Sequence, residues 1–181
     1  MNISSEVHLL SVLIFLALSY GFVLFADSCR EGSKERVTRG LLWAMLGAYF
    51  VIYAWLAFFI RPPDPTPRLE LRLFWSYREA FGPGLSVDRL GLARQILLNV
   101  LVYMPLGYLL MSLLRRARHP LLWTLLCGFG LSLLTEVAQY FSRRGLCELD
   151  DLLDNTLGCL LGALALLAGR WVIRRWREKR S

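Results

Sequence analysis

The sequence predicts an all-α fold, a polytopic membrane helix bundle of about five transmembrane helices with one extended external loop. The 181 residues are 56% hydrophobic and only 19% charged, with a mean hydropathy of +0.46, whereas soluble domains are roughly half apolar and a quarter charged. Five apolar runs are long enough to cross a bilayer, and the charged residues stand in short clusters between them. We therefore expect a single transmembrane domain over residues 1–181.

The apolar runs place the spans at residues 9–26, 41–60, 96–114, 121–141 and 152–173. The first run has no Lys or Arg before it and no cleavage signal of small residues after it, so we expect a retained helix and not a signal peptide. The second run ends before Pro62 and Pro63, which cannot continue a helix, and Pro120 suits the first turn of the fourth span.

The external loop covers residues 61–95. Its start contains four prolines within six residues and should be extended. Residues 69–77 alternate partly between apolar and polar side chains, which indicates a strand or a short segment lying along the membrane interface. Ser86 or Asp88 is expected to cap the N-terminus of the third span.

The distribution of basic residues predicts the orientation. The loops after the first and third spans and the C-terminus together hold 13 of the 21 Lys and Arg residues, and the opposite side holds 8. Since Lys and Arg stay preferentially in the cytoplasm, the N-terminus should lie outside and the C-terminus inside. The external loop and the connection at residues 143–151 would then face outward.

Three spans carry polar residues on one helical face. Helical offsets of three and four relate the members of each set, and intramembrane polar residues usually face a bundle interior or a cavity. We therefore expect the sets to converge on one cavity if these spans are neighbours. They are Gln95, Asn99 and Tyr103 in the third span; Ser132, Glu136, Gln139 and Arg143 in the fourth; and Asp151, Asn155, Gly158 and Gly162 in the fifth.

Some of these residues also have purely structural interpretations. Glu136 and Arg143 would suit a clamp near the interface, and Asp150 in a first helical turn would suit a cap. Gly158 and Gly162 allow close approach of another helix. Pro105 lacks an N–H group and is expected to kink the third span.

Several other classes of site find no support in the sequence. The four cysteines show neither disulfide nor C-x-x-C spacing, and Cys147 with Glu148, Asp150 and Asp151 has no histidine nearby, so we expect no metal. The bases form no single basic face, which argues against nucleic acid. No nucleotide, dinucleotide or hydrolase motif is present, and we expect no cofactor.

Taken together, the polar motifs resemble the VanZ-like family, named for an accessory protein of teicoplanin resistance. The resemblance runs from about the second span to the end of the fifth. It rests on Asn99-x5-Pro105-Leu-Gly107, on Glu136-x2-Gln139-x3-Arg143, and on Asp150-Asp151-x3-Asn155-x2-Gly158. The external loop is similar to the family only loosely.

The resemblance implies a multi-pass accessory protein of the bacterial cytoplasmic membrane that lowers susceptibility to lipid-tailed glycopeptides. Our preferred hypothesis is an outward-facing cleft that engages a membrane lipid, a lipid-linked wall precursor or a lipoglycopeptide. The expected ligand-binding residues are Asn99, Tyr103, Gln139, Arg143, Arg144, Asp150 and Asn155, and the expected structural residues are Pro105, Gly107, Gly158 and Gly162.

Two alternatives remain open from the sequence. The first is an intramembrane enzyme that uses Glu136 and Asp151 as an acid/base pair on a lipid-linked head group. The second is a structural partner of other envelope proteins that assembles through the Gly158 and Gly162 face.

Overall fold

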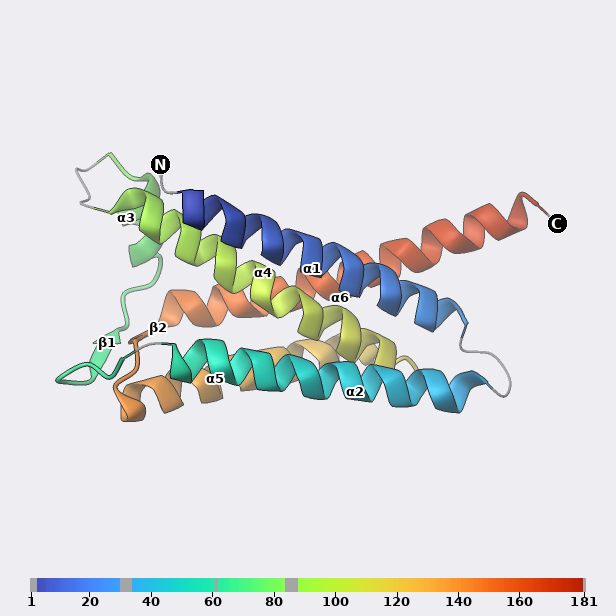
Figure 1. The fold of residues 1–181 in the computed structure, drawn as a ribbon, viewed down its shortest axis with the longest axis horizontal. Coiled ribbons are helices and arrows are strands. Elements are labelled where there is room, and N and C mark those ends of the chain that lie inside the picture. The colour runs from blue at the N-terminus through green and yellow to red at the C-terminus, as the bar shows by residue number, and fades with distance from the viewer. Residues whose placement is uncertain (1–2, 30–33, 61, 84–87, 181) are drawn as a thin grey trace.

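The computed structural model describes residues 3–29, 34–60, 62–83 and 88–180 and shows a bundle of long helices (Figure 1). The elements in chain order are α1 (Ile3–Ser28), α2 (Lys34–Ala54), the π-helical turn η1 (Trp55–Phe59), β1 (Arg68–Glu70), α3 (Trp75–Phe81), α4 (Arg89–Leu113), α5 (Pro120–Ser142), β2 (Leu146–Glu148) and α6 (Leu149–Glu178). The predicted all-α class is confirmed, because the strands form only one short two-stranded sheet.

Within the described part of the chain, four helical segments are long and apolar enough to cross a membrane. They are Glu35–Phe59, Arg89–Leu113, Pro120–Ser142 and Leu149–Glu178. The remaining predicted span, residues 9–26, falls in α1, where Val12–Ser28 forms a shorter apolar helix. Large apolar side chains on the outside of the bundle are exposed, among them Leu18, Val51, Leu134 and Phe141. Such an apolar exterior identifies a membrane protein.

The helix ends follow local chemistry. The Asp88 side chain accepts a hydrogen bond of 3.0 Å from the Gly91 N–H and caps α4, whereas the alternative cap Ser86 lies outside the described residues. Pro120 is the first residue of α5. The π-helical turn closes with a bond of 3.3 Å from the Ile60 N–H to the Trp55 carbonyl, just before Pro62.

The external loop is extended only in part. Arg68–Glu70 pairs in parallel with β2 and places Leu69 opposite Cys147, so the prediction of a strand holds for these residues. Residues 75–77 instead begin the short helix α3. Its first turn is bound by Asp150, whose carboxylate accepts from the Phe74 N–H at 2.6 Å and the Ser76 N–H at 3.0 Å. This partner lies far along the chain, so the local sequence pattern does not reveal it.

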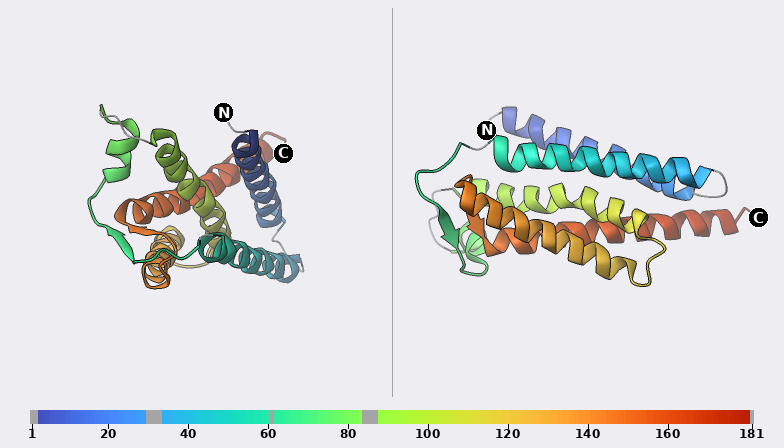
Figure 2. Two further views of the ribbon diagram at one scale, coloured as in Figure 1. Left: turned by 60° about the vertical axis from the view of Figure 1, so that its left-hand side comes forward. Right: turned by 90° about the horizontal axis from the view of Figure 1, so that it is seen from below.

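Helix α4 is central to the bundle. It packs against α1, α2, α3, α5 and α6, and its contact with α6 is the most extensive. The right-hand view of Figure 2 places α4 between the α1–α2 pair and the helices α5 and α6. We call the end of the bundle that carries α3, β1 and β2 the loop end, and the end where α2 begins the basic end (Figure 1).

Glycines allow α4 and α6 to approach closely. A Cβ on Gly158 would overlap the Val100 carbonyl, and one on Gly162 would overlap the Met104 carbonyl. A Cβ on Gly107 would overlap the Cys159 carbonyl from the opposite helix. The glycine face of α6 is therefore covered by α4 of the same chain, which leaves it unavailable for another protein. This overturns the expectation of a partner docked on the Gly158 and Gly162 face.

Candidate functional site

A cavity of about 600 Å³ lies between the helices toward the loop end. Side chains from α1, α2 with its π-helical turn, α4, α5 and α6 line it. The polar lining comes from α4, α5 and α6, and includes Arg94, Asn99, Tyr103, Thr135, Glu136, Gln139, Asp151 and Asn155. On the α1 and α2 side the lining is mainly apolar, with Val12, Leu56, Ala57 and Ile60. The cavity is thus amphipathic.

Six of the residues singled out from the sequence meet in this cavity: Asn99, Tyr103, Glu136, Gln139, Asp151 and Asn155. They come from three helices. Glu136, Gln139, Asp151 and Asn155 are buried. The three polar faces therefore converge, because α4 lies against both α5 and α6.

The carboxylate of Glu136 is tied to the start of α6. Its Oε2 accepts a bond of 2.9 Å from the Glu148 backbone N–H. The Glu148 side chain in turn accepts from Trp75 Nε1 at 2.9 Å and from Gln95 Nε2 at 3.0 Å. Gln95 Nε2 also donates to Asp151 Oδ1 at 3.2 Å. One amide group thus bridges two carboxylates, and the wall beside α6 is rich in acceptors.

Two amides of the cavity differ in how they are bound. Asn155 Nδ2 donates to Ser132 Oγ at 2.9 Å. Asn99 Nδ2, within the described part of the chain, is buried and has no hydrogen-bond partner. An unpaired buried donor costs about 1–3 kcal/mol. Asn99 therefore has a hydrogen bond left to give to a ligand in the cavity.

A chain of hydroxyl groups forms another part of the wall. Tyr103 Oη lies 2.7 Å from Tyr53 Oη, and Tyr53 donates to Thr135 Oγ1 at 2.9 Å. Thr135 then donates to the Leu131 carbonyl at 2.9 Å. These contacts link α2, α4 and α5 across the cavity and fix the orientation of Tyr103. Tyr53 and Thr135 were not among the site residues predicted from the sequence. Thr135 follows Ser132 by three residues and precedes Gln139 by four, so helical offsets could have found it, whereas Tyr53 joins the site only through the packing of α2.

Arg143 does not line the cavity, contrary to expectation. It ends α5 with a left-handed backbone, φ 58°, so its side chain leaves the helical face that carries Glu136. The exposed guanidinium donates to the Pro65 carbonyl at 3.3 Å. Neighbouring Arg144 also lies outside the lining and donates to the Phe58 carbonyl at 2.7 Å. Both arginines connect α5 to the chain around the end of α2.

Asp150 also lies outside the cavity lining. In addition to its two backbone bonds, its carboxylate accepts from Ser76 Oγ at 2.7 Å. One turn later, Asp154 accepts a hydrogen bond from the Tyr77 hydroxyl; burial, followed by this bond, raises the pKa of Tyr77. Asp150 therefore anchors and caps α3, whereas the cap interpretation expected it to act at the start of its own helix, α6.

Arg94 is the cation that lines the cavity. It stands one helical turn before Leu98, which also lines the cavity. Its side chain is exposed. Arg94 was not predicted as a site residue, because the polar face Gln95–Asn99–Tyr103 begins one residue after it. Its offset of four to Leu98 does place both residues on one face of α4.

A sequence model of the VanZ/LLP1 family matches residues 9–172 of the 181-residue chain. The chain belongs to this family. The resemblance drawn from the polar motifs is thereby confirmed. Comparisons with curated proteins and with solved structures gave no match.

The motif residues of this VanZ/LLP1 chain lie in three different parts of the structure. Asn99, Glu136, Gln139, Asp151 and Asn155 line the polar cavity. Gly107 and Gly158 lie where α4 and α6 are closest. The remaining positions lie elsewhere: Asp150 anchors α3, Arg143 ends α5, and the buried Pro105 inside α4 lines a second cavity.

The second cavity is apolar and has a volume of about 260 Å³. It lies between α1, α2 and α4 and shares Val12, Tyr53, Leu56 and Val102 with the polar cavity. Since the same side chains border both spaces, the apolar cavity adjoins the polar one. Helix α4 runs unbroken through Pro105.

Among the described residues, no group of three or more His, Cys, Asp or Glu side chains is arranged to hold a metal ion.

Proposed function

We propose that this VanZ/LLP1 protein is a membrane accessory protein of the cell envelope whose polar cavity engages the head group of a lipid-like or lipid-linked molecule. Through this cavity it lowers susceptibility to lipid-tailed glycopeptides of the teicoplanin type. The observation that carries the proposal is the junction of the polar and apolar cavities through Val12, Tyr53, Leu56 and Val102. An amphiphile has the same division into a polar head and an apolar tail.

The chemistry of the lining favours a head group that donates hydrogen bonds. Glu136 and Asp151 are acceptors in a buried wall, and hydroxyl or ammonium groups of a ligand would pair with them. Asn99 supplies the unpaired donor. Arg94, and not Arg143, is the cation placed to meet an anionic group of the same ligand. Gln139 and Asn155 would fix the orientation of the head group.

The enzyme hypothesis also has a specific observation in its favour. Glu136 and Asp151 are both buried and both line the cavity, as an acid/base pair on a lipid-linked head group requires. Incubation of the purified protein with a membrane lipid extract tests this alternative. Release of a new product that Asp151→Asn abolishes would support turnover, and unchanged lipids would leave the binding proposal alone.

We further propose that the loop end faces outward from the bacterial cytoplasmic membrane and the basic end faces the cytoplasm. Cys147 lies in β2 at the loop end, and Cys29 follows α1 at the basic end. A maleimide that cannot cross membranes should label a protein with Cys147 alone in intact cells, and one with Cys29 alone only after lysis. The reverse labelling would refute the outward cavity.

Asn99→Leu is the sharpest test of the cavity. The substitution removes a donor that has no partner, so the empty protein should keep its stability or gain up to about 1 kcal/mol. Binding of teicoplanin by the protein in nanodiscs should weaken roughly 5- to 150-fold, as loss of a hydrogen bond of about 1–3 kcal/mol implies. Resistance of cells should fall while the amount of folded protein stays constant.

Matched variants and ligands control this test. Glu136→Gln should lower binding in the same way, whereas Glu70→Gln makes the same chemical change outside the cavity, at a partly exposed side chain that is paired with Arg72. Arg143→Lys should leave binding unchanged, because Arg143 lies outside the cavity. A glycopeptide without a lipid tail should bind weakly. Equal binding of the tailless compound, or full activity of Asn99→Leu, would overturn the proposal.

A further inference from the structure

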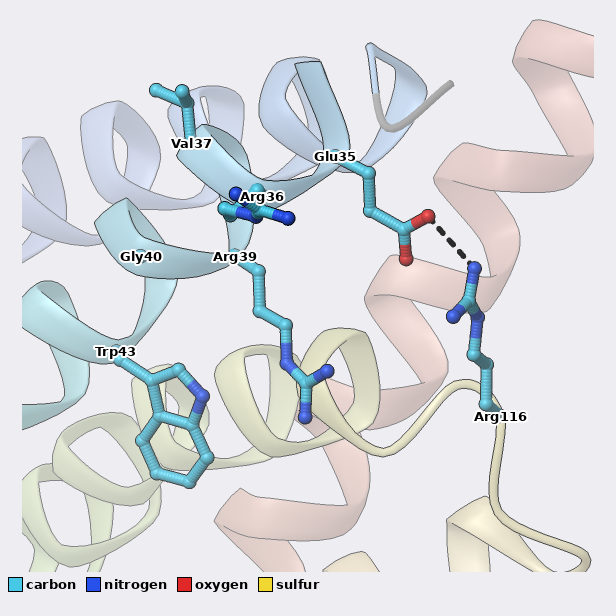
Figure 3. Close-up of a pocket in the computed structure, with 7 residues that line it drawn as sticks. All are labelled: Glu35, Arg36, Val37, Arg39, Gly40, Trp43 and Arg116. Carbon is cyan, nitrogen blue, oxygen red and sulfur yellow. Dashed lines mark hydrogen bonds and ion pairs between the residues drawn. The ribbon is translucent and has the colours of Figure 1, made fainter. Parts of the chain in front are cut away.

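A separate hollow of about 850 Å³ lies at the basic end, opposite the polar cavity. The first two turns of α2 supply most of its lining, and Arg116 from the connection between α4 and α5 completes it (Figure 3). The lining residues are Glu35, Arg36, Val37, Arg39, Gly40, Trp43 and Arg116. It shares no lining residue with the two cavities described above.

The hollow carries positive charge that the described residues do not fully neutralise. Its one carboxylate, Glu35, is already bound by Arg116 at 2.7 Å and by Arg115 at 3.4 Å. The side chains of Arg36 and Arg39 form no hydrogen bond or ion pair with any of the residues that the structure describes. In Figure 3 the Arg39 side chain extends from α2 into the space between Trp43 and Arg116. Guanidinium groups so placed suit a phosphate group, which they bind in bidentate fashion.

The surroundings of the arginines point to a lipid and not to a soluble anion. The membrane-spanning segment of α2 begins at Glu35, so the hollow lies at the level where lipid head groups meet the protein. Val37, Leu41 and Trp43 are exposed on the same helix, and the apolar surface continues toward the bilayer. Tryptophan is typical of this interfacial depth, and basic pockets between membrane helices bind anionic head groups.

We propose that this hollow binds the phosphate head group of an anionic membrane phospholipid, with Arg36, Arg39 and Arg116 around the phosphate and the acyl chains along α2 beyond Trp43. A neighbouring basic hollow also includes Arg116, but its Arg170 is paired with Asp27. Its exposed Arg174 and Arg177 likewise form no ion pair with a described residue, so it is Trp43 and the exposed apolar side chains of α2 that favour the α2 side for a lipid. The site is independent of the proposed function of the polar cavity.

The test compares two double variants of the full-length protein. Arg36→Gln/Arg39→Gln removes two charges from the hollow, and Arg118→Gln/Lys179→Gln removes two exposed charges near the same end but outside it. Each protein is placed in nanodiscs of phosphatidylcholine with increasing fractions of phosphatidylglycerol, and retained lipid is counted by native mass spectrometry. We expect apparent affinity for phosphatidylglycerol to fall about 30-fold in the first variant and to stay near the wild-type value in the second.

Further measurements keep the outcome decisive. Arg39→Lys should give an intermediate loss, because it keeps the charge and removes the planar fork, and it provides an answer if the double variant fails to fold. Inorganic phosphate should not displace the lipid at millimolar concentration. Equal losses in the two double variants would show general surface attraction and overturn the proposal. Displacement by inorganic phosphate would identify a site for a soluble anion and overturn it as well.

Discussion

The α4–α6 pair and the α1–α2 pair are built in opposite ways. Between α4 and α6, three glycines allow backbone to lie against backbone. In α1 and α2, a Cβ on Gly21, Gly40 or Gly47 would meet no heavy atom within 4 Å, and the contact between these helices is small. The α4–α6 pair is therefore packed closely and the α1–α2 pair loosely. The polar residues of the cavity lie on α4, α5 and α6, which form the closely packed half of the molecule.

The loosely packed half forms the apolar side of both cavities. Helix α1 is held to the rest by a few polar contacts, including the Tyr20 hydroxyl, which donates to the Ala165 carbonyl at 2.8 Å, and a contact of Ser19 with Tyr108. Elements with few buried contacts open at low free-energy cost. A lipid-like ligand would therefore enter between α1, α2 and α4, while the polar residues on α4, α5 and α6 keep their positions.

The largest expected effect is on stability, and it comes from making the same Gly→Ala substitution in the α4–α6 pair and in the α1–α2 pair. Gly158→Ala places a methyl group against the Val100 carbonyl and should destabilise the protein by about 3 kcal/mol, the upper part of the usual range for overpacking. Gly47→Ala adds the same group in open space and should be neutral or stabilise by up to about 1 kcal/mol. Thermal unfolding in nanodiscs measures both. Equal effects would contradict the described difference in packing.

A smaller effect is expected where α1 joins α6. Asp27 accepts two bonds from Arg170, at 2.7 and 2.8 Å, and a third from Ser112 Oγ at 2.7 Å. Asp27→Asn weakens this mostly buried group and should cost about 1.5–3 kcal/mol, as for hydrogen bonds to charged groups. Hydrogen exchange should increase mainly in α1.

The exposed pair of Asp64 and Arg68 is the matched control for Asp27→Asn. Its side chains are 31% and 55% exposed, and such pairs contribute at most about 1 kcal/mol. Asp64→Asn should therefore leave both stability and hydrogen exchange of α1 close to wild type. Faster exchange throughout α4 and α6 in Asp27→Asn would show that the two halves are not separate.

The sequence predicted the helices better than their ends. All five apolar runs fall in helical segments, and the helices extend past them: α4 begins at Arg89, directly after the expected cap Asp88, and α6 covers 149–178 around the predicted span 152–173. Hydropathy marks the segment that faces hydrocarbon, and polar first turns such as Arg89–Gln95 continue the same helix beyond it. The short helix α3 could not be predicted, because Asp150 completes it from a distant part of the chain.

The candidate site shows the same limit in its individual residues. Helical offsets brought Asn99, Glu136 and Asn155 to one cavity because all three lie well inside their helices. The offset to Arg143 fails because α5 ends there in a left-handed residue. Tyr53 joins the cavity through the packing of α2, which no periodicity within that helix encodes. Offsets thus hold within a helix, and neither helix ends nor helix neighbours follow from them.

The smallest expected effect concerns the charge of the polar wall, which Cys147 can report. Burial raises the pKa of the Cys147 thiol, and the nearby Glu136 carboxylate raises it further. Maleimide reacts with the thiolate, so labelling of a protein with Cys147 alone should be slow at neutral pH and should increase up to tenfold per pH unit below that pKa. Glu136→Gln removes a negative charge, lowers the pKa and should speed labelling several-fold at a fixed pH. Glu70→Gln controls for the loss of a carboxylate elsewhere at the loop end, and unchanged labelling in Glu136→Gln would mean that Glu136 is neutral in the folded protein.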